Sequence, residues 1–168
     1  MNLIKWSEVD PAVTNFVFYQ AERYLDAQFQ SGVAADSRAI TASSISVILA
    51  TGALSAAAGL WIAKQPPATY IATAVLGGLF LIATYLCFLA AKPVNFYPSG
   101  NHPRQWVPAL DMPINDAKGA EIENYQEMID DNATALDASA SWLNRGVMAP
   151  IASPFVAIIV FALVTSFS

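Results

Sequence analysis

Only a few side chains in this sequence are of types that could do chemistry, and four of them lie in one proline-rich segment. The segment reads "KPVNFYPSGNHPRQWVPALDMPIND" and contains Asn95, His102, Arg104 and Trp106. A histidine close to an arginine and an aromatic ring could bind a ligand, or could supply the acid-base group of an enzyme that acts on lipid. Aromatic and basic residues are also typical of the headgroup zone of a bilayer. The segment, residues 92–115, is therefore either a ligand pocket or, as we favour, an interfacial strap.

The remaining reactive residues do not form a catalytic or metal-binding pattern. Cys87 is the only cysteine and lies within hydrophobic sequence, where it is expected to pack rather than react. Asp130 and Asp131 are adjacent, so on a helix their carboxylates would point in different directions. There is no glycine-rich phosphate loop, and one histidine leaves little material for a metal site. We therefore expect a protein that is not an enzyme, with no catalytic residue, no cofactor and no metal ion.

The composition indicates the broad class of protein. Hydrophobic residues make up 55% of the 168 residues and charged residues only 12%, which is about half the charge of an average soluble domain. Three uncharged stretches, at about residues 39–63, 69–91 and 148–168, have the ~20 residues that a helix needs to cross a bilayer. We therefore expect an all-α membrane protein with three transmembrane helices in a single membrane domain, residues 1–168. The net charge of −5 argues against a nucleic-acid partner.

The sequence between the crossings predicts how they are connected. "KQPPA" separates the first two crossings, so residues 39–91 are expected to form a transmembrane hairpin with a tight turn. Amphipathic cytoplasmic helices are predicted over residues 10–38 and 116–145, capped by Asp10 and Asp116 respectively. Both should continue nearly unbroken into membrane segments. The five prolines of the strap argue against regular helix there.

Residue types predict two further features of these helices. The apolar face of the first polar helix consists of Phe18, Ala21, Leu25 and Phe29, widened by Val13, Val17 and Tyr24. Gly32 is the weak point of this helix, where it could bend. In the third crossing, residues 146–168, Pro150 and Pro154 predict either a kink near the interface or a hinge.

The distribution of basic residues predicts the orientation in the membrane. Of the eight Lys and Arg residues, only Lys64 lies in the short link between the first and second crossings. The other seven lie on the opposite side of the membrane, together with the N-terminus and the strap. By the positive-inside rule this second side is cytoplasmic. We therefore expect a multi-pass protein of the bacterial inner membrane, with a cytoplasmic N-terminus and a periplasmic C-terminus.

The first crossing has little bulk for a helix that faces lipid. Small residues allow membrane helices to approach closely, and hydroxyls can bond carbonyls of the same or a neighbouring helix. The predicted helix-packing face consists of Ser44, Thr51, Gly52, Ser55, Ala56 and Gly59. It could pack within one three-helix chain or, as we favour, against other chains. The second crossing is bulkier and better suited to lipid, with Gly77 and Gly78 permitting a close approach.

The second polar helix carries apolar residues at heptad spacing. This seam consists of Ile122, Tyr125, Ile129, Asn132, Leu136 and Leu143. A polar residue on such a seam, here Asn132, tends to fix register and partner number. The seam either joins copies in an oligomer or packs on the N-terminal helix of the same chain.

The order of these elements resembles that of the small bacterial membrane effectors of nucleotide-signalling defence systems, the Pycsar-type and SLATT-type modules. The shared features are an acid-and-base element such as "ADSRA", a hairpin of two crossings, a basic-proline exit such as "AKPVNF" and a polar helix. The resemblance implies membrane disruption by oligomers when a nucleotide signal is sensed. This chain has no recognisable nucleotide-sensing domain, so a partner would have to supply the signal.

These features together predict assembly within a membrane. The leading hypothesis is a non-enzymatic inner-membrane protein that forms homo-oligomers in lipid through its first crossing and its cytoplasmic helices, as a pore-forming or membrane-perturbing effector. The alternative is an accessory subunit of a larger membrane complex, in which the strap could grip a neighbouring subunit.

Overall fold

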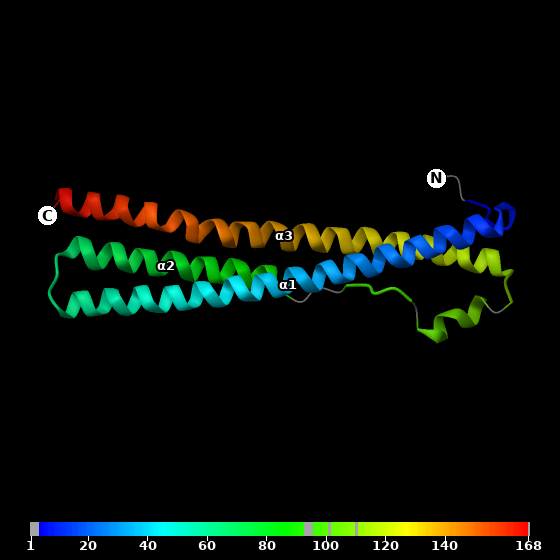
Figure 1. Ribbon diagram of the computed structural model, residues 1–168, viewed down its shortest axis with the longest axis horizontal. Coiled ribbons are helices and arrows are strands. Elements are labelled where there is room, and N and C mark those ends of the chain that lie inside the picture. The colour runs from blue at the N-terminus through cyan, green and yellow to red at the C-terminus, as the bar shows by residue number, and fades with distance from the viewer. Residues whose placement is uncertain (1–3, 93–95, 101, 110, 168) are drawn as a thin grey trace. The chain divides into compact units, whose positions relative to one another are not determined.

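The computed structural model describes residues 4–92, 96–100, 102–109 and 111–167, in which all regular secondary structure is helical (Figure 1). The elements in chain order are η1 (Trp6–Glu8), α1 (Pro11–Ile62), α2 (Pro67–Ala90), η2 (Pro103–Ala109) and α3 (Ile114–Phe167). Contacts divide the chain into two compact units. We call them the polar unit, Met1–Val33 with Val94–Leu136, and the membrane unit, Ala34–Pro93 with Asp137–Ser168.

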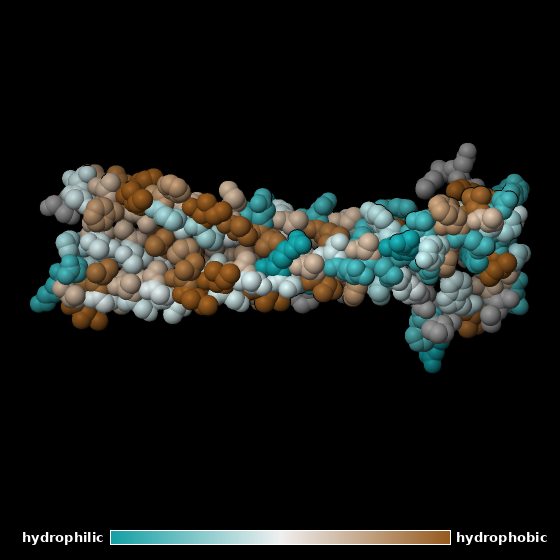
Figure 2. Space-filling model, viewed as in Figure 1, coloured by the Kyte–Doolittle hydropathy of each residue, from teal (hydrophilic) through white to brown (hydrophobic). Residues whose placement is uncertain are grey.

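The three long helices confirm the predicted fold class. Each contains a stretch that is long and apolar enough to cross a membrane, which makes this a multi-pass membrane protein by length and composition. α1 and α3 each continue from polar into apolar sequence without a break, as predicted. Figure 2 shows hydrophobic residues over much of the visible surface of the membrane unit.

Two local predictions at helix starts and in the strap are corrected. Asp10 does cap α1, since its Oδ1 accepts a hydrogen bond of 2.7 Å from the Ala12 N–H. Asp116 does not cap α3, because the helix begins at Ile114 and the N–H groups of Asp116 and Ala117 already bond the Pro113 carbonyl. The strap was expected to lack regular helix, but it contains η2, a 3-10 helix that begins at a proline, where a missing N–H removes no bond.

The hairpin turn between α1 and α2 ends the first crossing by a recognisable motif. The Gln65 N–H bonds the Leu60 carbonyl and the Lys64 N–H bonds the Trp61 carbonyl, both at 3.0 Å. This is the Schellman arrangement, which requires a left-handed residue just after the helix. Lys64 takes that position with a φ of 52°. Its charge lies where the helix dipole is negative, beside a bilayer boundary.

The helices of the membrane unit meet at small side chains. A Cβ added at Gly77 of α2 would lie 2.7 Å from the Leu54 side chain of α1, and one at Gly146 of α3 would lie 2.5 Å from Cys87 Sγ of α2. α2 therefore contacts both other helices. α2 was expected to suit lipid better than α1, but within the chain it is the more buried of the two, with 28% of its apolar window buried against 17% in α1 and 11% in α3. Of the bulky residues that suggested lipid, Leu81 and Ile82 are exposed, whereas Phe80 is buried against the other helices of the unit.

A serine explains how α3 tolerates two prolines. Pro154 has no N–H to donate to the Pro150 carbonyl four residues earlier. Ser153, which is fully buried, donates its hydroxyl to that carbonyl at 2.8 Å. The helix therefore continues through both prolines with this carbonyl satisfied, as a membrane segment requires.

The polar unit is packed on a face of α1 that includes Phe18, Ala21 and Leu25, as predicted, but differs from the prediction at its edges. The inward residues of α1 follow alternating spacings of four and three, as in a coiled coil. They are Thr14, Phe18, Ala21, Leu25, Gln28 and Gly32. Three bulky residues that were assigned to this face, Val13, Tyr24 and Phe29, are exposed. α1 continues without a break through Gly32. This glycine lies against the strap, because a Cβ added there would lie 2.9 Å from the Phe96 ring.

The adjacent glycines of α2 provide a test of this packing. Gly77→Ala should destabilise the folded chain by about 1–3 kcal/mol, because the new methyl group meets Leu54, including its backbone nitrogen at 3.2 Å. Gly78→Ala is the matched control, since nothing lies within 4 Å of its added Cβ, and alanine favours the helix. Thermal unfolding in detergent would compare the two. Equal stability of both variants would contradict the packing.

Candidate functional site

The predicted helix-packing face of α1 is not covered by the chain itself. All six of its residues are exposed: Ser44, Thr51, Gly52, Ser55, Ala56 and Gly59. No atom lies within 4 Å of a Cβ added at Gly52 or Gly59. The residues that α1 buries in the membrane unit lie on another face and are Ala39, Ser46, Ala50 and Ala57. α1 therefore has two faces of small residues, one used within the chain and one open.

Two hydroxyls of the open face, those of Ser44 and Thr51, are satisfied by their own helix. Ser44 Oγ donates to the Ile40 carbonyl and Thr51 Oγ1 to the Val47 carbonyl, each at 2.9 Å. Such bonds reduce the cost of placing a hydroxyl in an apolar environment. The face could therefore contact a neighbouring helix without depending on new hydrogen bonds, and close packing would supply the attraction.

The heptad seam of α3 packs inside the chain. Tyr125 is almost fully buried, with its ring 5.6 Å from the Phe18 ring of α1. The Ile129 carbonyl accepts a hydrogen bond of 3.1 Å from Gln28 Nε2. Ile122, Leu136 and Leu143 are each half-buried. Of the two interpretations of the seam, packing on the N-terminal helix is the one found for Tyr125 and Ile129.

Asn132 holds the strap rather than a second copy of the seam. Its side chain is fully buried. Oδ1 accepts a hydrogen bond of 2.9 Å from the Tyr97 N–H, and Nδ2 donates one of 3.0 Å to the Tyr97 carbonyl. Ser99 of the strap also hydrogen-bonds Asp26 of α1. The strap is thereby fixed to both helices of the polar unit.

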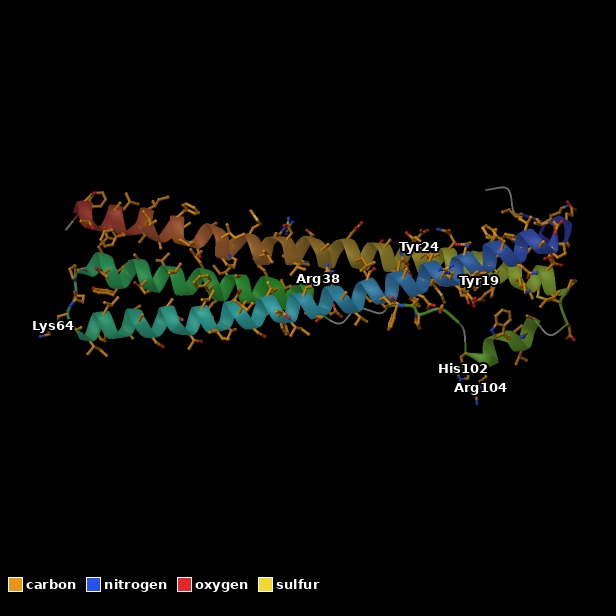
Figure 3. All side chains as sticks on the ribbon, in the orientation of Figure 1. Tyr19, Tyr24, Arg38, Lys64, His102 and Arg104 are labelled. Carbon is orange, nitrogen blue, oxygen red and sulfur yellow. The ribbon has the colours of Figure 1, made fainter. Side chains whose placement is uncertain are left out.

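Of the four strap residues that could do chemistry, the three that the structure describes do not form a common site. His102 and Arg104 are exposed and point away from the helices (Figure 3). The Arg104 N–H donates a hydrogen bond of 3.3 Å to His102 Nδ1, a contact within the strap itself. Trp106 is half-buried and lines a small pocket against α3. Asn95 lies outside the described residues.

A buried polar cluster around Tyr125 was missed by the sequence analysis. The Tyr125 hydroxyl lies 3.5 Å from Glu22 Oε1 and also shares a hydrogen bond with Glu121. Burial, and after it the charges of Glu121 and Glu22, raise the pKa of Tyr125 to about 12. Glu121 could have been found from its spacing, since it lies four residues before Tyr125 and therefore on the same helix face.

Four apolar or aromatic side chains of α1 are exposed, and two of them, Val13 and Tyr24, had been predicted to lie inside. Val13, Phe16, Tyr19 and Tyr24 are each more than half exposed (Figure 3 labels the two tyrosines). The Arg23 guanidinium lies 5.8 Å from the centre of the Tyr19 ring. An apolar face of this kind outside the membrane-crossing segments is typical of a protein contact.

Comparison with known proteins gives no match, and the described residues offer no metal site. No protein-family model, curated protein or solved structure matches this chain. Among the described residues, no group of three or more His, Cys, Asp or Glu side chains could hold a metal ion. Cys87 is buried against Gly146 in the membrane unit.

The Tyr125 cluster predicts a dependence of stability on high pH. Because folding raises the pKa of Tyr125 from 10.0 to about 12, the folded state holds this proton more tightly than the unfolded state. The resulting stabilisation is complete below pH 10 and is lost as the pH rises through about 12. Absorbance titration of the tyrosines in the folded chain should show a late step that Tyr125→Phe removes.

Tyr24→Phe is the control for this titration, because Tyr24 is an exposed tyrosine of the same unit. The late step should persist in that variant. If Tyr125→Phe left the late step in place, the assignment of the shifted pKa to Tyr125 would be wrong.

Proposed function

We propose that this chain is a self-assembling integral membrane protein whose copies meet through the open small-residue face of α1. The observation that carries the proposal is that α1 already packs on α2 with one face while Gly52 and Gly59, on its other side, are uncovered. A membrane helix that faced only lipid would gain nothing from two glycines, which cost helix stability. A second helix at that face would gain close van der Waals contact.

The assembly surface of this proposal is narrower than the sequence suggested. Tyr125 and Asn132 of the seam are buried within the chain, so we do not assign these two residues to the assembly surface. The open face, Ser44–Gly59, is what remains. We infer that the oligomer forms at membrane depth, and that its activity is to perturb or perforate the bilayer in the manner of the defence effectors that the chain resembles.

We extend the proposal to the membrane in which the chain lies and to its orientation there. Seven of the eight basic residues support a bacterial inner-membrane protein with a cytoplasmic N-terminus and a periplasmic C-terminus. Lys64, at the tip of the hairpin (Figure 3), would then be periplasmic. In intact cells an impermeant thiol reagent should label Lys64→Cys and not Ser99→Cys, both in a Cys87→Ser background. The opposite labelling pattern would reverse the orientation.

The assembly is tested by blocking the open face. Gly52→Leu and Gly59→Leu should each disperse the oligomer, because a bulky side chain at either position keeps a second helix at a distance. The measurement is the native mass of the complex after gentle extraction from its own membranes. Ion leakage from vesicles that contain the purified chain would then test for a pore.

Gly78→Leu is the matched control for these variants. Gly78 is also a membrane-unit glycine with nothing within 4 Å of its added Cβ, but it lies on α2. The control should keep the native mass. An unchanged mass in both α1 variants, or a monomeric wild type, would defeat the proposal.

A second candidate function is an accessory subunit of a larger membrane complex. The exposed aromatic side chains of Phe16, Tyr19 and Tyr24 favour it, because aromatic residues are enriched where proteins contact partners. The strap no longer supports this candidate, since Tyr97 and Ser99 bind the chain's own helices. Tyr19→Ser with Tyr24→Ser should release stoichiometric partners from the native complex while the α1 glycine variants retain them. Purification of the chain alone, at normal yield, would count against an accessory role.

A further inference from the structure

A pocket in the polar unit lies between the strap and the first turns of α3. Its volume is about 210 Å³. The strap contributes Trp106, Pro108 and Met112, and α3 contributes Ala117, Ala120 and Glu121. Drug-sized ligands need pockets of roughly 300–1,000 Å³, so a matching ligand would be a small group.

The walls of this pocket combine three kinds of chemistry. Most are aliphatic, and one is the indole of Trp106. The charged member is Glu121, which is only 9% exposed. A carboxylate in a poorly solvated site attracts a cation more strongly than one in water. The face of an indole ring attracts cations as well, most effectively those with little hydration.

The described acidic neighbours add negative charge, and none of the residues that line the pocket is basic. The Tyr125 hydroxyl next to Glu121 also lies 3.5 Å from Glu22 Oε1. The nearby bases of the strap do not line the pocket, since Arg104 and His102 point away from it (Figure 3). A phosphate or carboxylate ligand would therefore meet repulsion here, whereas a cation would meet attraction.

We propose that this pocket binds a small organic cation, with Glu121 as counter-ion and Trp106 as aromatic wall. Methylated ammonium groups fit best, because their methyl groups can contact the aliphatic walls while the charge faces the carboxylate and the ring. A lipid headgroup and a free metabolite can both carry this group. The inference does not depend on the proposed assembly, because every lining residue lies in the polar unit.

Choline and its neutral isostere, 3,3-dimethylbutan-1-ol, test the chemistry directly. The full-length chain, in maltoside micelles without added lipid, would carry 5-fluorotryptophan at its four tryptophans, with Trp106→Phe assigning the fluorine signal of Trp106. Choline should shift the Trp106 signal saturably, and the alcohol should bind about tenfold more weakly or worse. Equal binding of the two compounds, or no saturable shift with choline, would overturn the proposal.

Two variants then locate the charge and the pocket. Glu121→Gln should weaken choline binding by about tenfold while retaining the shape of the side chain. Glu127→Gln is the control, as an exposed acid of the same helix, and should leave the affinity unchanged. If Glu121→Gln does not fold, Ala120→Leu at the exposed edge of the pocket should block binding with the carboxylate retained. Full affinity in Ala120→Leu would overturn the site.

Membranes of two different lipids distinguish a lipid headgroup from a free metabolite as the source of the cation. In nanodiscs of phosphatidylcholine, a headgroup ligand should shift the Trp106 signal without free choline, and nanodiscs of phosphatidylglycerol should not. A free metabolite would give the shift only on addition of choline, equally in both membranes. Either pattern supports the pocket and assigns its ligand.

Discussion

The packing of the membrane unit depends on how closely two helix backbones can approach each other. Lipid tails are as apolar as the side chains that would leave them, so burial alone does not bring membrane helices together. Contact must come from close packing, and the structure has it where side chains are absent or small. Gly77 meets Leu54, and Gly146 meets Cys87. The same requirement gives meaning to Gly52 and Gly59, which no part of the chain covers.

The polar unit is held together by a different principle. Its buried positions include Thr14, Gln28, Asn132 and Glu121, and the hydrogen bonds of Gln28 and Asn132 join segments distant in sequence. Buried polar groups need specific partners, so they select one arrangement of helix and strap. The cost is that several large apolar side chains of α1 are left outside, and Phe16 is 63% exposed.

The positions of the helices could be predicted from the sequence, but the helix faces that are buried could be predicted only in part. Length and hydropathy predicted three crossings, and Asp10 with Pro11 predicted the start of α1, because these signals are local. Val13 and Phe29 were placed inside because they are apolar, whereas Thr14 and Gln28 lie inside because of their heptad spacing and their bonds. The pairing of Trp106 with Glu121 depends on how the strap folds back, which no local pattern encodes.

The turn at Lys64 has a consequence for how the chain enters a membrane. Only residues 63–66 separate α1 from α2, and the Schellman motif leaves no slack in them. The two crossings cannot be released into lipid as independent segments, because the turn is too short to remain behind. The two crossings must therefore enter the bilayer together. In the proposed orientation, the polar groups that cross the hydrocarbon with them are those of one turn, which carries a single ammonium group. In that orientation, insertion of the hairpin is thus one event with a low charge barrier.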